Sequence, residues 1–167
     1  MAVTGKENPR VLVLGVGNDL LTDEGIGVHV ARRLANEPLP PDVTVYDGGV
    51  GGIDLLEVIQ GCDRLIIVDA VNAQAEPGTV FRFRPDEVEC ILREHKTSLH
   101  QVDLFDTIKI ARFLGSCPEI VVIGIQPKEI DWGLALTPEL TVILPGILAL
   151  VRDEIEVCRE RSEASGY

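Results

Sequence analysis

The chain has 167 residues, of which 46% are hydrophobic and 25% charged, and its formal net charge is −12. This length and composition predict one globular domain, 1–167, with a buried core, and we expect residues 1–9 and about 160–167 to be frayed. The acidic balance argues against nucleic acid or an anionic membrane as a partner. Residues 1–10 lack the apolar run of a signal peptide, and no stretch approaches the roughly 18 apolar residues of a membrane span.

The N-terminal part of the chain predicts a β-loop-α unit. Residues 11–14 form a short apolar run that ends at Gly15, which is typical of a strand buried on both faces of a parallel sheet. Apolar residues then recur at helical spacing, so we expect a helix from about residue 25 to residue 35. The loop between strand and helix carries three carboxylates, those of Asp19, Asp23 and Glu24.

This loop does not fit the common phosphate-binding patterns. A dinucleotide-binding loop needs a third glycine at position 20, which is Leu20, and no Gly-Lys-Ser/Thr of a P-loop follows. A phosphate site also needs backbone N–H groups at a helix N-terminus, whereas three carboxylates repel an anion and suit a cation. A nucleotide-binding module is therefore supported only by Gly15 and Gly17.

Strands and helices alternate along the rest of the chain. We expect strands at residues 43–47, 64–71, 79–84 and 119–126, and helices at residues 53–59, 85–93, 103–114 and 138–158. Apolar and basic residues alternate in 79–84, which indicates a half-exposed edge strand, with antiparallel pairing as an option. Thr137 is the expected N-cap of the last helix, and Pro145 is expected to kink or split that helix.

This order of elements predicts an α/β fold. We expect a three-layer α/β/α sandwich around a mostly parallel, twisted sheet of about five strands. Residues 95–101 and 132–136 are expected to be irregular. We find no internal repeat, no low-complexity segment and no second domain in the sequence.

Carboxylates stand near the carboxyl ends of the first three predicted strands, where ligands bind in open α/β sheets. These residues are Glu24, Asp47 and Asp69. If the strand order is 2-1-3, Glu24 and Asp69 flank the crevice between neighbouring strands. Because Asp69 ends a nearly all-apolar strand, its carboxylate needs a cation, a helix N-terminus or several donors. The alternative is that Asp69 accepts hydrogen bonds from the backbone of its own loop.

One histidine is well placed to join these carboxylates. His100 lies in a predicted irregular segment at the entry of a helix, although a histidine that only bonds a loop carbonyl is the alternative there. We expect His29 to lie at the surface or to be partly packed, and His95 to be solvated. Two carboxylates and one imidazole with open positions suit zinc, nickel, manganese or iron rather than calcium.

The cysteines do not suggest a nucleophile or a metal knuckle. They lie far apart, without a Cys-x-x-Cys pair, at positions 62, 90, 117 and 158. This spacing is typical of buried free thiols in a reducing cytosol, and Cys62 and Cys117 are expected to pack before strands. Because the chain also lacks a Gly-x-Ser-x-Gly elbow, serine and cysteine nucleophile chemistry are not expected.

Several motifs of the chain occur together in one known family. They are Gly-Val-Gly-Asn-Asp-Leu-Leu-Thr-Asp-Glu-Gly-Ile-Gly-Val (15–28), Asp-Gly-Gly (47–49), Leu-Ile-Ile-Val-Asp-Ala (65–70), Ser-Leu-His-Gln (98–101), Gly-Ile-Gln-Pro (124–127), Trp-Gly (132–133) and Leu-Thr-Pro (136–138). In this order, over about residues 10–155, the chain resembles the maturation endopeptidases of NiFe hydrogenases. The joint occurrence is specific, whereas any one of the motifs is not.

The resemblance implies a function and a set of site residues. Members of the family are cytoplasmic α/β/α proteins that remove a C-terminal peptide from the precursor of the hydrogenase large subunit once nickel has been inserted. The family's metal ligands fall on Glu24, Asp69 and His100. The metal is nickel supplied by the substrate, and we expect zinc or cadmium to be able to occupy the site in vitro. The family's aspartate for recognition of nickel-loaded substrate falls on Asp47, which is the candidate catalytic residue.

Other interpretations stay open at this point. A non-proteolytic nickel-sensing or chaperone protein for the same precursor would use the same three ligands, and a nucleotide-binding α/β module is the less favoured alternative. The sequence does not decide whether Asp47 or Glu24 acts as the general base, or whether the metal alone suffices. We expect the protein to be a monomer.

Overall fold

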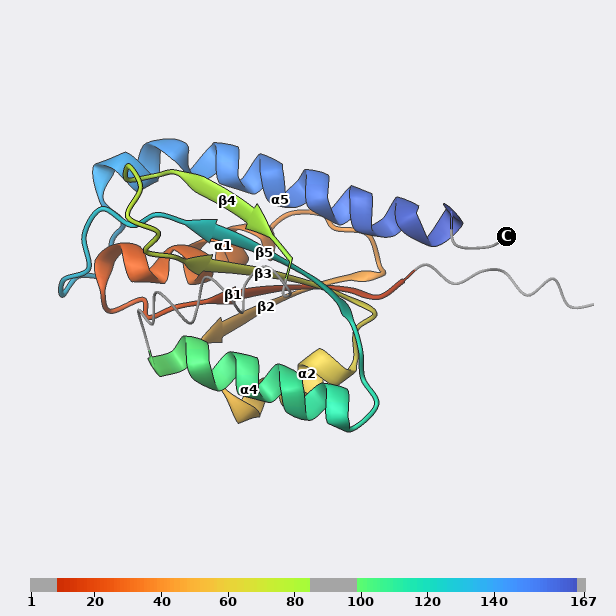
Figure 1. Ribbon diagram of the computed structural model, residues 1–167. Helices are drawn as coiled ribbons and strands as arrows, with labels where there is room; N and C mark the ends of the chain where they lie inside the picture. Colours follow the sequence, from red (N-terminus) through yellow and green to blue (C-terminus); the bar gives the residue numbers. More distant parts are fainter. Residues whose placement is uncertain (1–8, 85–98, 165–167) are drawn as a thin grey trace, which may run out of the picture.

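The computed structural model describes residues 9–84 and 99–164, without the side chains of residues 99–103 and 161–164. In these ranges the chain forms three layers, with one five-stranded sheet between two layers of helices (Figure 1). This arrangement is the α/β/α sandwich predicted from the alternation of strands and helices.

The strands of the sheet follow the order β2-β1-β3-β5-β4. Their bounds are β1 Val11–Val16, β2 Val43–Gly49, β3 Arg64–Ala70, β4 Val80–Phe83 and β5 Glu119–Ile125. All neighbouring pairs are parallel except β4 with β5, which is antiparallel. The order 2-1-3, which the sequence analysis considered as a condition for the site, is present, and the prediction of an edge strand near residues 79–84 is confirmed.

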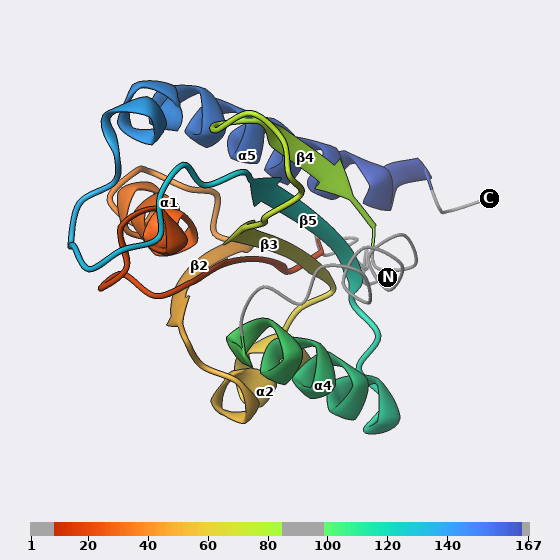
Figure 2. The same cartoon turned by 60° about the vertical axis from the view of Figure 1, so that its left-hand side comes forward.

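Two groups of helices cover the two faces of the sheet (Figure 2). One face carries α1 (Ile26–Leu34), which follows the 3-10 turn η1 (Thr22–Gly25), and α5 (Pro138–Ala164). The other face carries α2 (Leu56–Gln60), which follows the 3-10 turn η2 (Ile53–Leu55), and α4 (Leu99–Phe113). Within the described residues, no helix is both long and apolar enough to cross a membrane.

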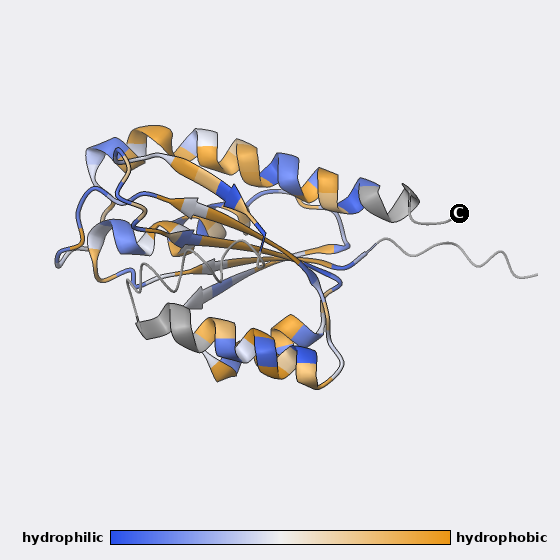
Figure 3. Cartoon of the chain, in the orientation of Figure 1, coloured by the Kyte–Doolittle hydropathy of each residue, from blue (hydrophilic) through white to orange (hydrophobic). Residues whose placement is uncertain are grey.

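The core consists of two apolar layers, one on each face of the sheet (Figure 3). Side chains of β1 alternate between them, so that Val11 and Val13 face α1 and α5 while Leu12 and Leu14 face α2 and α4. All six residues of β1 are buried, as expected of a strand covered on both faces.

Two glycines allow α1 to lie unusually close to the sheet. A Cβ atom on Gly15 would lie 2.1 Å from the Gly27 carbonyl oxygen, and a Cβ atom on Gly27 would lie 2.1 Å from the carbonyl oxygen of Val68. These separations are shorter than any non-bonded contact, so neither position accepts a side chain without movement of the backbone. The contact fixes the first turn of α1 against the ends of β1 and β3.

The helix α4 starts earlier than predicted, and one of its apolar residues is exposed. It begins at Leu99, four residues before the expected start, so His100 lies in its first turn and not in an irregular loop. No glycine or proline interrupts residues 99–103, which lets the helix start early. Phe113 is 90% exposed, although it is a large apolar residue. It follows the buried Ala111 by two residues, a rotation of about 200° around the helix axis.

The other differences are local. The helix α5 passes through Pro145 without being split, because this proline is on the exposed side, where water can hydrate the carbonyl that loses its helical partner. It ends at Ala164, beyond the expected end at residue 158. Cys62 and Cys158 are buried as expected, whereas Cys117 is exposed. The predicted helix at 85–93, His95 and Cys90 lie outside the described residues.

Candidate functional site

The parallel strands bring their carboxyl ends to one edge of the sheet. Gly15 of β1 pairs with Asp47 of β2 on one side and with Val68 of β3 on the other. Asp47 and Asp69 therefore stand on the two strands that flank β1, and Glu24 comes from the turn that follows β1. The edge predicted from sequence to carry the site does gather these three carboxylate-bearing positions.

Asp69 is buried at this edge, on the face that α2 and α4 cover. Ile66, Val68 and Ala70 belong to the core layer under α1 and α5, so the alternation of the strand turns Asp69 toward the opposite layer. Its side chain is only 5% exposed. The first turn of α4, which includes His100, lies at the same edge and on the same face (Figures 1 and 2).

Glu24 lies in the 3-10 turn η1, directly before α1, and is buried. Its backbone amide donates to the Leu21 carbonyl at 2.9 Å, which closes the turn. Gly17 permits this arrangement, because it has φ of +137° and its Cβ position would lie 2.0 Å from the Glu24 carbonyl oxygen. Since Gly27 touches Val68 one helical turn later, Glu24 is held near the end of β3, the strand of Asp69.

The three predicted metal ligands thus come from segments that meet at one edge. Glu24 and Asp69 are both buried there, and the backbone of His100 lies on the Asp69 face. The side chain of His100 is outside the described ones, so the ligand set stays a prediction. Among the side chains that the structure does describe, no three cysteine, histidine or acidic residues are gathered as a metal site.

Asp47 faces the other way, toward α1. Its Oδ2 accepts a hydrogen bond from Arg32 Nε at 2.8 Å, and its Oδ1 accepts one from the Gly49 amide at 3.1 Å. Arg32 also contacts Asp19, with Nη1 2.8 Å from Oδ2. The hydrogen bond from Arg32 to Asp19, and then the one to Asp47, raise the pKa of the Arg32 guanidinium. One arginine of α1 therefore joins the loop after β1 to the end of β2, a link that the sequence analysis did not predict.

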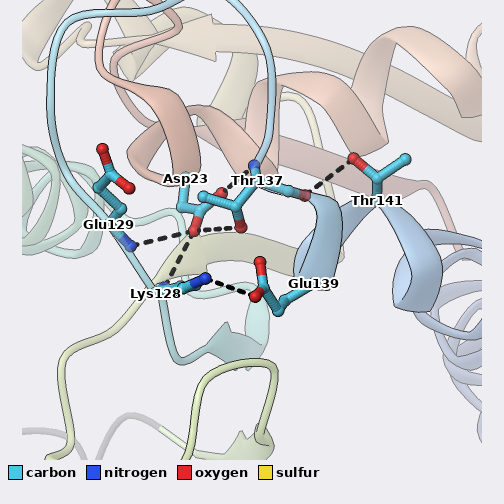
Figure 4. A network of polar contacts seen from close by, with 6 residues as sticks. All are labelled: Asp23, Lys128, Glu129, Thr137, Glu139 and Thr141. Atoms are coloured by element: carbon cyan, nitrogen blue, oxygen red, sulfur yellow. Dashed lines mark hydrogen bonds and ion pairs between the residues drawn. The ribbon is translucent and has the colours of Figure 1, made fainter.

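The third carboxylate of the loop, Asp23, is used inside the protein. It is fully buried and accepts hydrogen bonds at 2.8 to 3.2 Å from the amides of Lys128, Glu129 and Thr137 and from the Thr137 hydroxyl (Figure 4). The sequence analysis counted Asp23 among three carboxylates that suit a cation, but in the structure its carboxylate accepts hydrogen bonds from the protein itself. Its donors arrive from the segment between β5 and α5.

Thr137 occupies the predicted N-cap position of α5, because its carbonyl accepts the Thr141 amide at 2.9 Å. Its hydroxyl bonds Asp23 instead of capping the helix. The Lys128 ammonium pairs with Glu139 in the first turn of α5 (Figure 4). These contacts hold the segment between β5 and α5 in place at both ends, at Lys128 and at Thr137.

Gln126 organises the loop that follows Asp69. Its Oε1 accepts the amides of Ala73 and Ala75 at 2.8 and 3.2 Å, and its Nε2 donates to Asn72 Oδ1 at 3.3 Å. The sequence analysis singled out Gly-Ile-Gln-Pro only as a motif and assigned Gln126 no role. The buried amide fixes the exit of β3 and therefore the surroundings of Asp69.

His29 is partly packed, as predicted. Burial, followed by the charge of Arg32, lowers the pKa of the imidazole. Its Nε2 is buried and has no hydrogen-bond partner among the described residues.

Comparisons with known proteins agree on one family. A sequence model of the hydrogenase maturation protease family matches residues 28–154. The hydrogenase expression/formation protein HupD of Bradyrhizobium diazoefficiens is 42% identical over 138 residues, which cover 81% of this chain and 72% of HupD. The hydrogenase 2 maturation protease of Escherichia coli is 38% identical over 151 residues, which cover 86% of this chain and 92% of the protease.

The fold comparison points the same way. The solved structure of the hydrogenase maturating endopeptidase HybD from E. coli superimposes with a TM-score of 0.82 at 37% sequence identity. The match covers 88% of this chain and 92% of HybD. The five-stranded sheet and its helix layers are therefore those of a known protease structure.

Proposed function

The chain belongs to the hydrogenase maturation protease family, and we propose that it removes a C-terminal peptide from the nickel-loaded precursor of a NiFe hydrogenase large subunit. The observation that carries this proposal is the convergence of two buried carboxylates, Glu24 and Asp69, at the edge where α4 begins. Family membership also removes the reason to interpret Gly15 and Gly17 as part of a nucleotide site.

We propose that Glu24, Asp69 and His100 bind the nickel that the precursor already carries. Two carboxylates and an imidazole are ligands that nickel accepts, and three protein ligands leave positions for the precursor's own groups or for water. Burial of Glu24 and Asp69 supports this role, because a buried carboxylate is stabilised when a cation lies beside it.

The proposed reaction is hydrolysis of one peptide bond beside the nickel. The oxygen of water bonds to the scissile carbonyl carbon, the C–N bond breaks, and the leaving amine takes up a proton. A cation held at this edge would polarise the carbonyl or lower the pKa of the attacking water. Asp47 faces α1 and is held by Arg32, an arrangement that suits recognition of the precursor better than proton transfer at the Asp69 face.

We propose that the enzyme works as a monomer in the cytoplasm, without nucleic acid or membrane as a partner. Cys62 and Cys117 are free cysteines, which suits a reducing compartment. The net charge of −12 is unfavourable for binding nucleic acid or anionic lipid.

The decisive experiment is mass spectrometry of nickel-loaded precursor before and after incubation with the purified protein. We expect a shortened large subunit with the wild type and roughly a hundredfold slower shortening with Glu24→Gln, Asp69→Asn or His100→Ala. The matched control is Asp153→Asn, which neutralises an exposed carboxylate on α5 and should leave the rate unchanged. Normal shortening by all three site variants would remove the ligand assignment.

The same experiment separates the enzyme from a nickel-sensing chaperone. A chaperone would form a complex with the nickel-loaded precursor and leave its mass unchanged. An enzyme that also needs the nickel would shorten the loaded precursor and leave the nickel-free one intact. Complex formation without any cleavage would therefore favour the chaperone and overturn the proposed hydrolysis.

A further inference from the structure

Three large apolar side chains are exposed together beside the candidate site. Leu20 in the loop after β1 is 50% exposed, and Trp132 and Leu134 in the segment after β5 are 79% and 72% exposed. We call these three residues the apolar platform. Single exposed apolar residues are common on proteins, but a contiguous set that includes tryptophan marks an interaction surface.

Backbone pairing places the residues of the apolar platform next to one another. Leu21 forms a parallel bridge with Gly133, with hydrogen bonds from the Gly133 amide to Leu20 and from the Thr22 amide to Gly133 at 2.9 and 2.8 Å. In this register Leu20 lies beside Trp132, and Leu134 follows two residues later.

The platform is rigid, although it belongs to a loop. The Thr22 hydroxyl donates to the Glu129 carbonyl at 2.7 Å and accepts the Asp131 amide at 3.1 Å. The buried Asp23 carboxylate holds both ends of the same segment, at Lys128 and at Thr137. Because this backbone is already ordered, a partner would bind it without a large ordering cost.

The platform adjoins the proposed nickel site. Leu20 and Glu24 belong to one short loop, and the segment that carries Trp132 follows β5, which pairs with β3 at Asp69. Figures 1 and 2 both show the segment after β5 beside the loop after β1, at the carboxyl edge of the sheet. A protein that placed its scissile bond at Glu24 and Asp69 would meet this surface.

Exposed carboxylates give the surroundings of the apolar platform a negative charge. Glu129 and Asp131 are exposed within the same segment, while the nearby Lys128 ammonium is paired with Glu139. Charges at the rim of an interface favour a partner of the opposite sign. The matching partner segment is therefore apolar and carries a lysine or arginine.

We propose that the apolar platform binds an apolar segment of the precursor that carries a lysine or arginine and lies next to the bond to be cut. This inference rests on the proposed function, since it names the surface by which the protease selects its protein substrate. The platform then contributes to substrate affinity, and the carboxylates behind it contribute to the reaction.

The test compares steady-state cleavage of nickel-loaded precursor by the wild type and by Trp132→Ser/Leu134→Ser. We expect KM to rise roughly tenfold or more, the effect of losing an aromatic anchor, and kcat to change much less. Phe113→Ser is the matched control, because Phe113 is even more exposed than Trp132 but lies at the far end of α4. Its KM should equal that of the wild type, and the melting temperatures of all three proteins should agree.

The outcomes separate this inference from the proposed function. If the wild type does not cleave the precursor, the proposed function fails. If the wild type cleaves and the double variant has an unchanged KM, the platform is not the docking surface. A wild-type dimer that the double variant converts to a monomer would assign the platform to a second copy of the chain and overturn the inference.

A second pair of substitutions tests the charge of the partner. Glu129→Gln/Asp131→Asn keeps the shape of both side chains, including an oxygen that can accept the Trp132 amide as Asp131 does now. We expect a several-fold higher KM at low ionic strength and a weaker dependence of KM on salt. An unchanged KM at low ionic strength would contradict a basic partner segment.

Discussion

Thr137 and Asp23 are 114 residues apart in the sequence, yet the Thr137 amide and hydroxyl both donate to the Asp23 carboxylate at 2.8 Å. This contact fastens the start of α5 to the turn that carries Glu24. The neighbouring carboxylates of Asp23 and Glu24 therefore have different tasks. Asp23 holds the architecture of the edge, whereas Glu24 is the residue that we propose as a ligand of the precursor's nickel.

We expect Asp23→Ala to destabilise the fold. The substitution leaves the buried Thr137 amide and the partly buried amides of Lys128 and Glu129 without their acceptor, which costs about 3 kcal/mol and, for a domain of this size, lowers the melting temperature by roughly 6 to 12 °C. Differential scanning calorimetry measures the change. Asp153→Ala, which removes an exposed carboxylate from α5, is the control and should melt like the wild type. Equal melting temperatures for both variants would show that the Asp23 network adds no stability.

We expect Gly27→Ala to damage both stability and cleavage. The added methyl group would lie 2.1 Å from the Val68 carbonyl oxygen and 2.3 Å from that of Val16, so α1 must move off the sheet. Overpacking of this kind costs about 3 kcal/mol. Because Glu24 directly precedes α1, the movement should also slow cleavage of the precursor at temperatures where the variant is folded.

Gly146→Ala is the matched control for this experiment. Gly146 lies inside α5, and nothing lies within 4 Å of its Cβ position. Alanine should therefore stabilise the helix by about 1 kcal/mol and leave cleavage unchanged. Urea denaturation of the two variants should give free-energy changes of opposite sign, and a shared sign would refute the role of close packing at Gly27.

We expect Arg32→Met to slow cleavage with little effect on stability. Arg32 is more than half exposed, and exposed ion pairs contribute little to the free energy of unfolding. Its loss leaves Asp19 and Asp47 without their shared cation, so the two loops they belong to should shift and cleavage should slow roughly tenfold. The rate is measured on nickel-loaded precursor, and Arg33→Met, which changes the next exposed arginine, serves as the control. A wild-type rate for Arg32→Met would mean that the bridge plays no part in substrate recognition.

Local sequence patterns predicted most of this fold because they report which faces are buried. The unbroken apolar runs of β1 and β3 indicated central strands, and alternation in β4 indicated an edge. The same reasoning does not extend to Phe113, an apolar residue that the helical rotation from the buried Ala111 turns toward solvent. Phase decides burial in a helix, and a single apolar residue does not report it.

The sequence predicted only part of the candidate site. The physical reason why a residue could or could not be predicted differs from one residue to the next. Asp69 stood out because a carboxylate that ends a buried strand is costly without a partner, and Glu24 because it follows the first strand at the same edge of the sheet. Asp23 and Glu24 are adjacent and chemically similar, so only the long-range donors of the segment after β5 distinguish them. Arg32 gave no signal, since a solvated arginine on a helix has the same pattern as one that bridges two loops.

Stability in acid should depend on ion pairs that fasten α5. Hydrogen bonds from Arg159 to Asp42 and from Arg152 to Glu37 lower the pKa of both carboxyl groups below their unfolded values of 3.8 and 4.5. A carboxyl whose folded pKa is depressed stabilises the fold above its unfolded pKa and loses this contribution as the pH falls through the folded pKa. The free energy of unfolding should thus decrease below about pH 4.5, and Arg159→Met should flatten part of this decrease in urea titrations at pH 2 to 6. The same acid profile in both proteins would contradict the assignment.

At alkaline pH we expect the Cys62 thiol to make the free energy of unfolding decrease. Burial, followed by the nearby charge of Asp63, raises the pKa of the Cys62 thiol to about 11, against 9.0 for an ordinary thiol. Between these values the unfolded chain releases the proton that the folded chain keeps, so the free energy of unfolding falls as the pH rises through this window, at about 1.4 kcal/mol per pH unit. Cys62→Ala removes this group and should flatten the decrease between pH 9 and 11, even if the small cavity lowers stability at every pH.

Thiol labelling at pH 8 gives an independent check, because the exposed Cys117 should react well before Cys62, whose thiol donates to the Ile59 carbonyl at 3.1 Å. Faster labelling of Cys62 than of Cys117 would contradict its burial.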